Sequence, residues 1–443
     1  MLLDEIDLSA GASKALDALL TDRLALLCGA GLSMAAPSLL PSAAALAWKA
    51  KQKYDATFGG DRDPLPESID DQAKFFFERG ELETVYLRSY IDNNAFAAVP
   101  NKGHFAAADL LLTGAINTAV STNVDTLIET AGNMLFGNVG AGVTRARVAA
   151  LAPDVSPLLK IHGCWSDPAG TVWAAGQVAA EPIKSRVEEC ADWLTNRLLD
   201  RDLLIVGYWT DWDYLNEVLD VSLGAVNPSR VIVVDPCETA SFATKAPALF
   251  ALGQRASQEF CHVRCSGDVF LDRLRVDFSR TFVRRVLHAG AGSYSAHVGT
   301  GPENAWLEPG SMDAEVLWRI RRDLEGRNPN EPARARVPIE EPLLGMTLLQ
   351  LQARGAVADG SYWSLGGRRV RVLRAANRPL HEVEAAFARE TPPVVAPELV
   401  IAVGAEALPL PPSIARGTGS GSIARGTASR WLSRTEAVAE LGL

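Results

Sequence analysis

The sequence predicts an α/β fold, in which a Rossmann-like parallel sheet carries helices on both faces and a smaller α+β domain follows. Two observations support this prediction. Short apolar segments alternate with segments whose apolar residues recur at helical spacing. The short segments are apolar throughout rather than at every second position, which is typical of strands buried on both faces of a parallel sheet.

The elements of the large sheet are expected in a regular order. The predicted strands cover residues 24–28, 115–121, 158–161, 203–206 and 230–235. The predicted helices cover residues 43–54, 70–90 with a break at Gly80, 105–112, 125–135, 181–199, 213–221 and 272–287. We expect the strand at 230–235 to be the last of this sheet.

The amino-acid composition changes near residue 288, where glycine and serine become frequent. We therefore predict a catalytic domain over 1–287, a linker over 288–310 and a small α+β partner or regulatory domain over 311–407. A helix is expected at 312–324 and a hairpin at 362–373, turning at Gly366-Gly367. The tail at 408–443 contains the repeat SIARGTGSG–SIARGTASR, is of low complexity, and could close as a terminal helix.

Composition limits the classes of function. The chain has 443 residues and a net charge of −10, while residues 281–443 alone carry +2, so the acidic main body disfavours direct nucleic-acid binding. No apolar run is long enough to span a bilayer, and the first ten residues lack the basic region of a secretion signal. The six cysteines include no CxxC pair, so we expect a cytoplasmic protein without a disulfide scaffold or a zinc ribbon.

The first candidate site is the turn Gly29-Ala30-Gly31, with Ser33, directly after the strand at 24–28. Glycines at such a turn allow the backbone to approach a pyrophosphate closely. Met34 stands where a third glycine is usual, and a plain strand–helix turn is the alternative interpretation.

Two further candidates follow the next strands. Thr122, Asn123 and Asp125 come after the strand at 115–121, where an amide can both donate and accept hydrogen bonds; the alternative is a helix start capped by Asp125. His162 follows the strand at 158–161 and could act as a base, although a lone histidine is more often structural. The other histidines, including His104, are expected to be structural or at the surface.

The last candidates follow the strands at 203–206 and 230–235. Gly207 and Tyr208 end the first of these strands, and Asp235 ends the second, where it could bind a ribose hydroxyl. Ordinary turns are the alternative at both places. Trp209 and Trp212 could flank a site or serve in packing.

The order of these motifs resembles the sirtuin family, and more closely its prokaryotic, NAD-consuming, sirtuin-like branch. The resemblance covers about residues 20–285. Its segments are GAGLS (29–33), LPSAAAL (40–46), STNVDTLIE (121–129), KIHG (160–163), LLIVGYWTDWDYL (203–215) and VIVVDP (231–236).

The resemblance implies a role for each candidate. Asn123 and His162 would be catalytic, and NAD would be the substrate. The remaining candidates would bind the dinucleotide: Gly29, Ala30, Gly31 and Ser33 at the phosphates, Thr122 and Asp125 at the nicotinamide ribose, and Gly207, Tyr208 and Asp235 on the adenosine side. The implied function is an NAD+ glycohydrolase that serves as a bacterial antiviral, abortive-infection effector.

Two departures bear on the alternatives. Protein deacylases of the family carry a Pro-Asp-Phe-Arg segment, which Leu40-Pro41-Ser42-Ala43 replaces here, and a four-cysteine zinc ribbon, for which Cys261 and Cys265 lack partners at ligand spacing. An NAD-dependent deacylase and a non-enzymatic nucleotide-binding subunit remain as alternatives. By analogy with the branch, we expect a homo-oligomer gated by a separately encoded activator, such as a ring-forming ATPase or another sensor subunit.

Overall fold

The computed structural model describes residues 3–60, 62–135, 137–208, 213–310, 312–326, 341–359, 362–387, 397–404 and 429–443. The chain divides into two compact units, Met1–Leu274 and Arg275–Leu443. The predicted domain boundary at 287 therefore lies 13 residues beyond the division in the structure.

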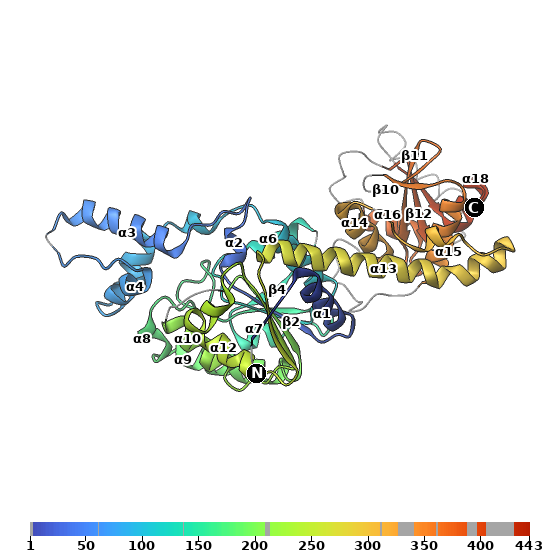
Figure 1. The fold of residues 1–443 in the computed structure, drawn as a ribbon. Coiled ribbons are helices and arrows are strands. Elements are labelled where there is room, and N and C mark those ends of the chain that lie inside the picture. Colours follow the sequence, from blue (N-terminus) through green and yellow to red (C-terminus); the bar gives the residue numbers. More distant parts are fainter. Residues whose placement is uncertain are drawn as a thin grey trace. The chain divides into compact units, whose positions relative to one another are not determined.

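The first unit is built on an eight-stranded parallel sheet with the order β1-β8-β7-β6-β2-β3-β5-β4 (Figure 1). All its paired strands are parallel, which confirms the predicted fold class. The strands are β1 (Asp4–Ile6), β2 (Leu24–Cys28), β3 (Thr118–Ser121), β4 (Gly140–Gly142), β5 (Pro157–Lys160), β6 (Asp202–Val206), β7 (Arg230–Val234) and β8 (Glu259–Val263).

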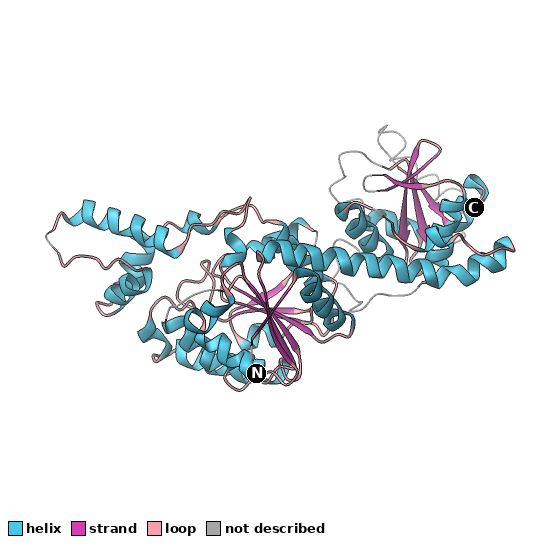
Figure 2. Ribbon diagram, viewed as in Figure 1, coloured by secondary structure: helices cyan, strands magenta, loops and turns pink. Residues whose placement is uncertain are grey.

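Helices connect these strands (Figure 2). They are α1 (Leu8–Leu20), α2 (Gly31–Met34), α3 (Ala43–Phe58), α4 (Ile69–Phe77), the π-helix η1 (Leu82–Tyr90), the 3₁₀-helix η2 (Asn93–Phe96), α5 (Lys102–Leu112), α6 (Leu127–Met134), α7 (Arg145–Ala149), α8 (Ala175–Val178), α9 (Ile183–Arg197), α10 (Asp213–Leu223), the 3₁₀-helix η3 (Thr239–Ser241), α11 (Phe242–Lys245), α12 (Pro247–Gln254) and α13 (Gly267–Val298). The expected break at Gly80 is confirmed, since this residue separates α4 from η1.

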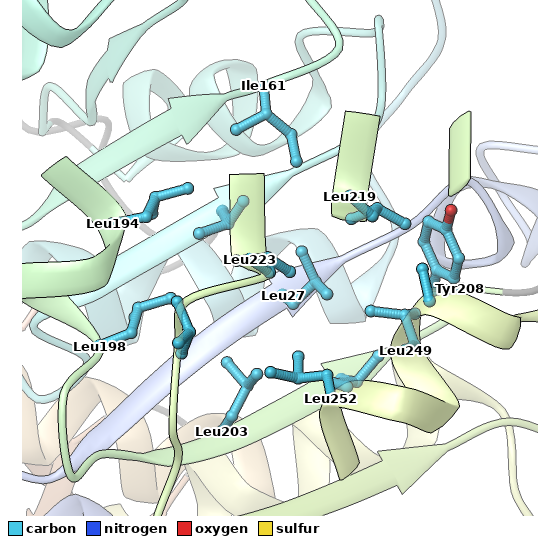
Figure 3. Packing of buried hydrophobic residues seen from close by; sticks show 14 of the residues in the cluster. Leu27, Ile161, Leu194, Leu198, Leu203, Tyr208, Leu219, Leu223, Leu249 and Leu252 are labelled. Carbon is cyan, nitrogen blue, oxygen red and sulfur yellow. The ribbon is translucent and has the colours of Figure 1, made fainter. Parts of the chain in front are cut away.

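Both faces of the sheet are buried, as the apolar strands predicted. On one face, Leu27, Leu203 and neighbouring strand residues pack against leucines of α9, α10 and α12 (Figure 3). Leu26 and Leu204 alternate with these residues, so they point to the other face, and both are completely buried. Helix α1 contacts β2, β6 and β8.

The sheet is larger than the sequence predicted, because β1, β4 and β8 were not among the predicted strands. The segment at 230–235 is therefore not the last strand, since β8 pairs with β7 and β1 pairs with β8. The sequence of β8, EFCHV, mixes charged and polar residues with apolar ones, while β1 and β4 have three residues each. Such short or polar strands depend on pairing with their neighbours rather than on a local apolar signal.

The second unit holds a five-stranded mixed sheet with the order β13-β12-β11-β10-β9. Its described elements are η4 (Asn304–Leu307), α14 (Ala314–Glu325), α15 (Pro342–Ala353), β9 (Val357–Asp359), β10 (Tyr362–Leu365), β11 (Arg368–Arg374), α16 (Leu380–Phe387), β12 (Leu399–Val403), β13 (Arg430–Ser433) and α18 (Arg434–Leu441). The predicted hairpin and terminal helix are confirmed. Of the nine-residue repeat, only the last two residues, Ser429 and Arg430, are described, and Arg430 begins β13.

The predicted linker is wrong in its first part, because α13 continues to Val298. Leu287 and Tyr294 of this helix belong to the core of the second unit, together with Leu317, Leu348 and other buried residues. The glycine- and serine-rich composition suggested a linker, but burial of these two large side chains stabilises the helix there.

Candidate active site

Five of the predicted motifs follow neighbouring strands at one edge of the large sheet. They come after the carboxyl ends of β7, β6, β2, β3 and β5, which are adjacent in that order. The chain runs from β2 to β3 on one side of β2 and later returns to β6 on its other side. In open α/β sheets, ligands bind outside the carboxyl ends of strands at such a change of direction.

The glycine turn after β2 packs closely against the turn after β6. The Gly29 amide donates to Val206 O at 2.9 Å, and the Gly31 amide donates to Gly207 O at 2.7 Å. A Cβ atom on Gly29 would lie 2.6 Å from the Cα of Tyr208, and one on Gly31 would lie 2.6 Å from Gly207 O. These glycines are therefore required by the fold itself, and contact of the exposed Ala30 and Gly31 with a phosphate stays a prediction.

Ser33, in α2, is the centre of a buried hydrogen-bond network. Its hydroxyl donates to Asp125 Oδ2 at 2.8 Å and contacts His104 Nε2 at 3.1 Å. Asn123 Nδ2 also donates to Ser33 Oγ, at 3.1 Å. The network joins α2, α5 and the loop after β3, and its four side chains are nearly inaccessible to solvent.

The protonation state of His104 follows from its partners. Its Nδ1 accepts the Asn101 amide at 3.1 Å, so the neutral ring carries its proton on Nε2 and donates it to Ser33. Burial lowers the pKa of His104 to about 4, although the Asp125 and Asp268 carboxylates act in the opposite direction. Ser33 thus accepts from His104 and Asn123 and donates to Asp125, which occupies its hydroxyl within the protein.

This arrangement fixes the orientation of the Asn123 amide. Because Nδ2 is held by Ser33, the carbonyl oxygen Oδ1 must point elsewhere, and it has no hydrogen-bond partner among the residues that the structure describes. Asn123 is 6% exposed. A buried acceptor without a partner is costly, so this atom is well suited to a donor supplied by a ligand or water.

His162 lies on the loop after β5, next to the loop that carries Asn123. Its Nδ1 lies 2.9 Å from Thr122 O, which can only accept, so Nδ1 bears the proton and the neutral ring keeps its lone pair on Nε2. Burial is the main cause that lowers the pKa of His162 to about 4; the backbone of Thr122 raises it, the Arg186 charge lowers it, and the backbone of Val172 raises it. The imidazole is therefore neutral near pH 7 and can accept a proton.

The remaining residues of the loop after β3 support this geometry. Thr122 donates its amide to Cys28 O at 3.0 Å and so ties the loop to the end of β2. Asp125 Oδ1 accepts the Leu127 amide at 3.0 Å, which confirms its expected role at the helix start. Its second oxygen accepts from Ser33, and its predicted contact with the nicotinamide ribose stays a prediction.

Lys160 is a site residue that the sequence analysis quoted but gave no role. Its ammonium group donates to Asp125 O at 2.6 Å, to Glu129 Oε1 at 3.0 Å and to Cys164 Sγ at 3.2 Å. Burial lowers its pKa, but Glu129 and Cys164 outweigh burial, so the pKa of Lys160 is raised. It therefore fixes the backbone of Asp125 as a permanent cation.

The predicted adenosine-side residues lie in different surroundings. The side chain of Tyr208 is 2% exposed and lies in the hydrophobic core with Leu219 and Leu249, so only its backbone belongs to the turn (Figure 3). Asp235 Oδ1 accepts the Cys237 amide at 2.9 Å, as in an ordinary turn, and burial raises the pKa of this carboxyl. Trp209 and Trp212 lie outside the described residues.

The sequence analysis overlooked the part that His104 and Asn101 play. Asn101 accepts the His104 amide, and His104 Nδ1 accepts the Asn101 amide, which together form a capping box at the start of α5. The Asn-x-x-His spacing could have revealed this local contact. His104 and Ser33 are 71 positions apart in the sequence, so no local sequence pattern predicts their contact.

Comparison with known proteins agrees with the geometry. Residues 117–249, which include Asn123 and His162, match the family model of the SIR2-like domain. Comparison with curated proteins gives no match.

Similar solved structures include a Sir2 homologue in complex with NAD (17% identity, 62% of this chain and 95% of that chain, TM-score 0.33). Another is a complex of Sir2, a p53 peptide and NAD+ (15% identity, 60% of this chain and 97% of that chain, TM-score 0.33). These TM-scores are low, so the fold assignment rests on the sheet topology described above.

The described residues contain no group of three or more histidine, cysteine, aspartate or glutamate side chains arranged to hold a metal ion. Within the same ranges, no helix combines the length and apolarity needed to cross a membrane.

Proposed function

We propose that this chain hydrolyses NAD+ to nicotinamide and ADP-ribose. The observation that carries the proposal is the buried carbonyl oxygen of Asn123, which has no hydrogen-bond partner among the described residues, while Ser33 holds the amide nitrogen beside the His162 loop. Both residues fall within the SIR2-like segment. Ala30, Gly31 and Asp235 would lie along the rest of the dinucleotide, and NAD+ is the substrate.

The chemistry suits a site of polar groups rather than a strong nucleophile. Nicotinamide leaves as a neutral molecule from a cationic ring, and the ribose carbon passes through an oxocarbenium-like transition state. Asn123 Oδ1 would accept a hydrogen bond from the attacking water or from a ribose hydroxyl. The neutral imidazole of His162 would take up the proton that water releases, a contribution typically worth about 10²–10⁴-fold.

Water is a better acceptor for this site than an acylated lysine. The segment after His162 folds back on it, because the Val172 amide donates to His162 O at 2.8 Å. Thr171 Oγ1 accepts the Cys164 amide at 2.9 Å and closes the same segment. The segment 40–43, which stands in place of the Pro-Asp-Phe-Arg of the family's deacylases, and the lack of cysteine pairs at zinc-ligand spacing favour water over a peptide. Protein deacylation is therefore the second candidate.

The proposal includes a biological setting that rests on the resemblance. An uncontrolled NAD+ hydrolase would drain its own cell, so we propose that the chain is an antiviral, abortive-infection effector in the cytoplasm. Its activator would be a separately encoded sensor, such as a ring-forming ATPase, or assembly into a homo-oligomer. The second unit, Arg275–Leu443, is the candidate for this coupling.

Nicotinamide release from NAD+ tests the proposed reaction. The full chain is assayed by chromatography and mass spectrometry, alone and with the product of the adjacent gene. We expect ADP-ribose and nicotinamide in equal amounts, and Asn123→Ala and His162→Ala should each lose at least about 100-fold in turnover. His381→Ala, at an exposed position of α16, is the matched control.

Three outcomes would contradict parts of the proposal. Normal turnover in both site variants would remove Asn123 and His162 from the chemistry. Acyl-ADP-ribose formed from NAD+ and an acylated peptide would establish the deacylase instead. Tight NAD+ binding without turnover under every condition would favour a non-enzymatic nucleotide-binding subunit.

A further inference from the structure

A buried arginine ties together the ends of two strands beside the candidate site. Arg186 lies on α9 and is 9% exposed. Its guanidinium donates to Val143 O and to Ile161 O, both at 3.0 Å. Val143 follows β4, and Ile161 follows β5 and immediately precedes His162. One side chain therefore fixes the backbone from which His162 projects.

No carboxylate lies within ion-pair distance of Arg186 in the described part of the chain, and its Nε has no hydrogen-bond partner there. Burial lowers the pKa of Arg186, while Cys190 and Asp167 act in the opposite direction. Burying a cation against neutral carbonyls alone is costly. A neutral amide side chain could donate to a carbonyl at a lower desolvation cost. The positive charge of Arg186, rather than its hydrogen bonds alone, therefore needs an explanation.

The position of this charge gives it an effect on His162. The guanidinium is bonded to the residue before His162, and a nearby cation disfavours protonation of an imidazole. The Arg186 charge lowers the pKa of this ring together with burial, while the backbone of Thr122 and Val172 raises it. Asp167 and Cys190 are the titratable groups that face Arg186.

We propose that Arg186 is a positioning residue for the reaction: its guanidinium fixes the loop that carries His162, and its charge favours the neutral imidazole that can accept a proton. This inference rests on the proposed function for its catalytic consequence. The positioning of the His162 loop and the effect of the Arg186 charge on the imidazole are properties of the protein itself, so both can be measured without NAD+.

The primary test is an NMR titration of the His162 imidazole in the full chain, with the resonance assigned by its loss in His162→Gln. In Arg186→Met, which removes the charge at similar length, the titration midpoint should rise by at least about 0.5 pH. In Arg186→Lys, which keeps the charge, it should stay near the original value. Lys184→Met removes a charge from an exposed position of the same helix and should leave the midpoint unchanged.

Turnover of NAD+ provides the second measurement. The acidic limb of the pH–kcat profile should move to higher pH in Arg186→Met but not in Arg186→Lys, while KM changes less than kcat. A purely structural role would lower activity in both without moving the limb. If Arg186→Met does not fold, Arg186→Gln replaces it, because its amide can still donate to one carbonyl.

A folded charge-free variant with an unchanged His162 midpoint would overturn the proposal, as would an equal rise in Arg186→Lys. These outcomes are distinct from failure of the proposed function. A chain that never releases nicotinamide but shows the expected midpoints would retain the electrostatic coupling and lose the assigned reaction.

Discussion

At the scale of single residues, Ser33 decides how the candidate site is organised. Its hydroxyl accepts from His104 and Asn123 and donates to Asp125, so each of its neighbours has a defined donor or acceptor role. The consequence reaches Asn123, whose carbonyl oxygen is left for a ligand. His104 therefore acts on the site through Ser33 without having to touch the substrate.

Replacement of His104 tests this chain of contacts. His104→Gln should disturb the donor to Ser33 and lower NAD+ turnover about five- to tenfold, because one buried hydrogen bond contributes about 1 kcal/mol. The side-chain amide resonances of Asn123 should shift in the same variant, which provides a readout independent of activity. His381→Gln, at an exposed position, is the control. Unchanged Asn123 resonances would disprove the link.

The two buried histidines also make stability depend on pH. The folded-state pKa of both His104 and His162 is lowered from 6.5 to about 4, chiefly by burial. Between these values the unfolded chain binds more protons, so stability falls as pH decreases from 6.5 to 4 and levels off below. Each histidine should cost on the order of 3 kcal/mol across this window.

Thermal unfolding followed from pH 7 to pH 4 measures this effect. His162→Gln should flatten the decline, since glutamine takes up no proton, whereas His297→Gln, at an exposed position of α13, should leave it unchanged. A decline of the same steepness in all three proteins would show that other groups cause it.

At the scale of elements, the site depends on how closely the turns after β2 and β6 approach each other. Gly207 has a φ of +64°, and a Cβ atom there would lie 2.5 Å from Leu32 N. Both the backbone conformation and the contact exclude a larger residue. The turn after β2 is thus held by close backbone contacts with the turn after β6, which the glycines of both turns allow.

Two glycine substitutions separate strain from collision. Gly207→Ala should lower the free energy of unfolding by well over 2 kcal/mol, since it combines a left-handed backbone, costing about 1–2 kcal/mol, with a backbone clash. Gly80→Ala has a similar φ of +68° but no atom within 4 Å, so it should cost only the strain. Urea unfolding of both variants gives the comparison, and equal losses would contradict the proposed collision.

At the scale of the whole molecule, each unit has its own buried core. Ile205 lies in the core of the first unit and Leu348 in that of the second, and both are completely buried. A unit with its own core can unfold as a separate cooperative step. This independence is what the proposed regulatory role of the second unit requires, since that unit contributes no strand to the large sheet.

Calorimetry of core variants tests this independence. Ile205→Ala and Leu348→Ala should each cost about 2–5 kcal/mol, the usual loss for a large-to-small change in a core. We expect two unfolding transitions, of which each substitution lowers a different one. A single transition lowered equally by both would mean that the units unfold together.

The sequence alone determined the central strands, their parallel arrangement and the edge at which the candidate residues gather. Continuous apolar segments such as Leu24–Cys28 and residues 203–206 carry that information locally, because a strand buried on both faces is apolar throughout. The hairpin around Gly366-Gly367 and the hydrogen bond from the Leu127 amide to Asp125 at the start of α6 were also predictable from neighbouring residues.

Other features depend on contacts between segments far apart in the sequence, and only the tertiary structure decided them. Strand β8 exists because β7 offers it a partner edge, and β1 exists because β8 does. The last turns of α13 are stabilised by the core of the second unit. The contact of His104 with Ser33, and of Arg186 with Ile161, joins residues that no local pattern relates. The periodicity of apolar residues predicts which face of a helix or strand is buried. The hydrogen-bond partner of a buried polar group depends on contacts between distant segments, which form only in the folded protein.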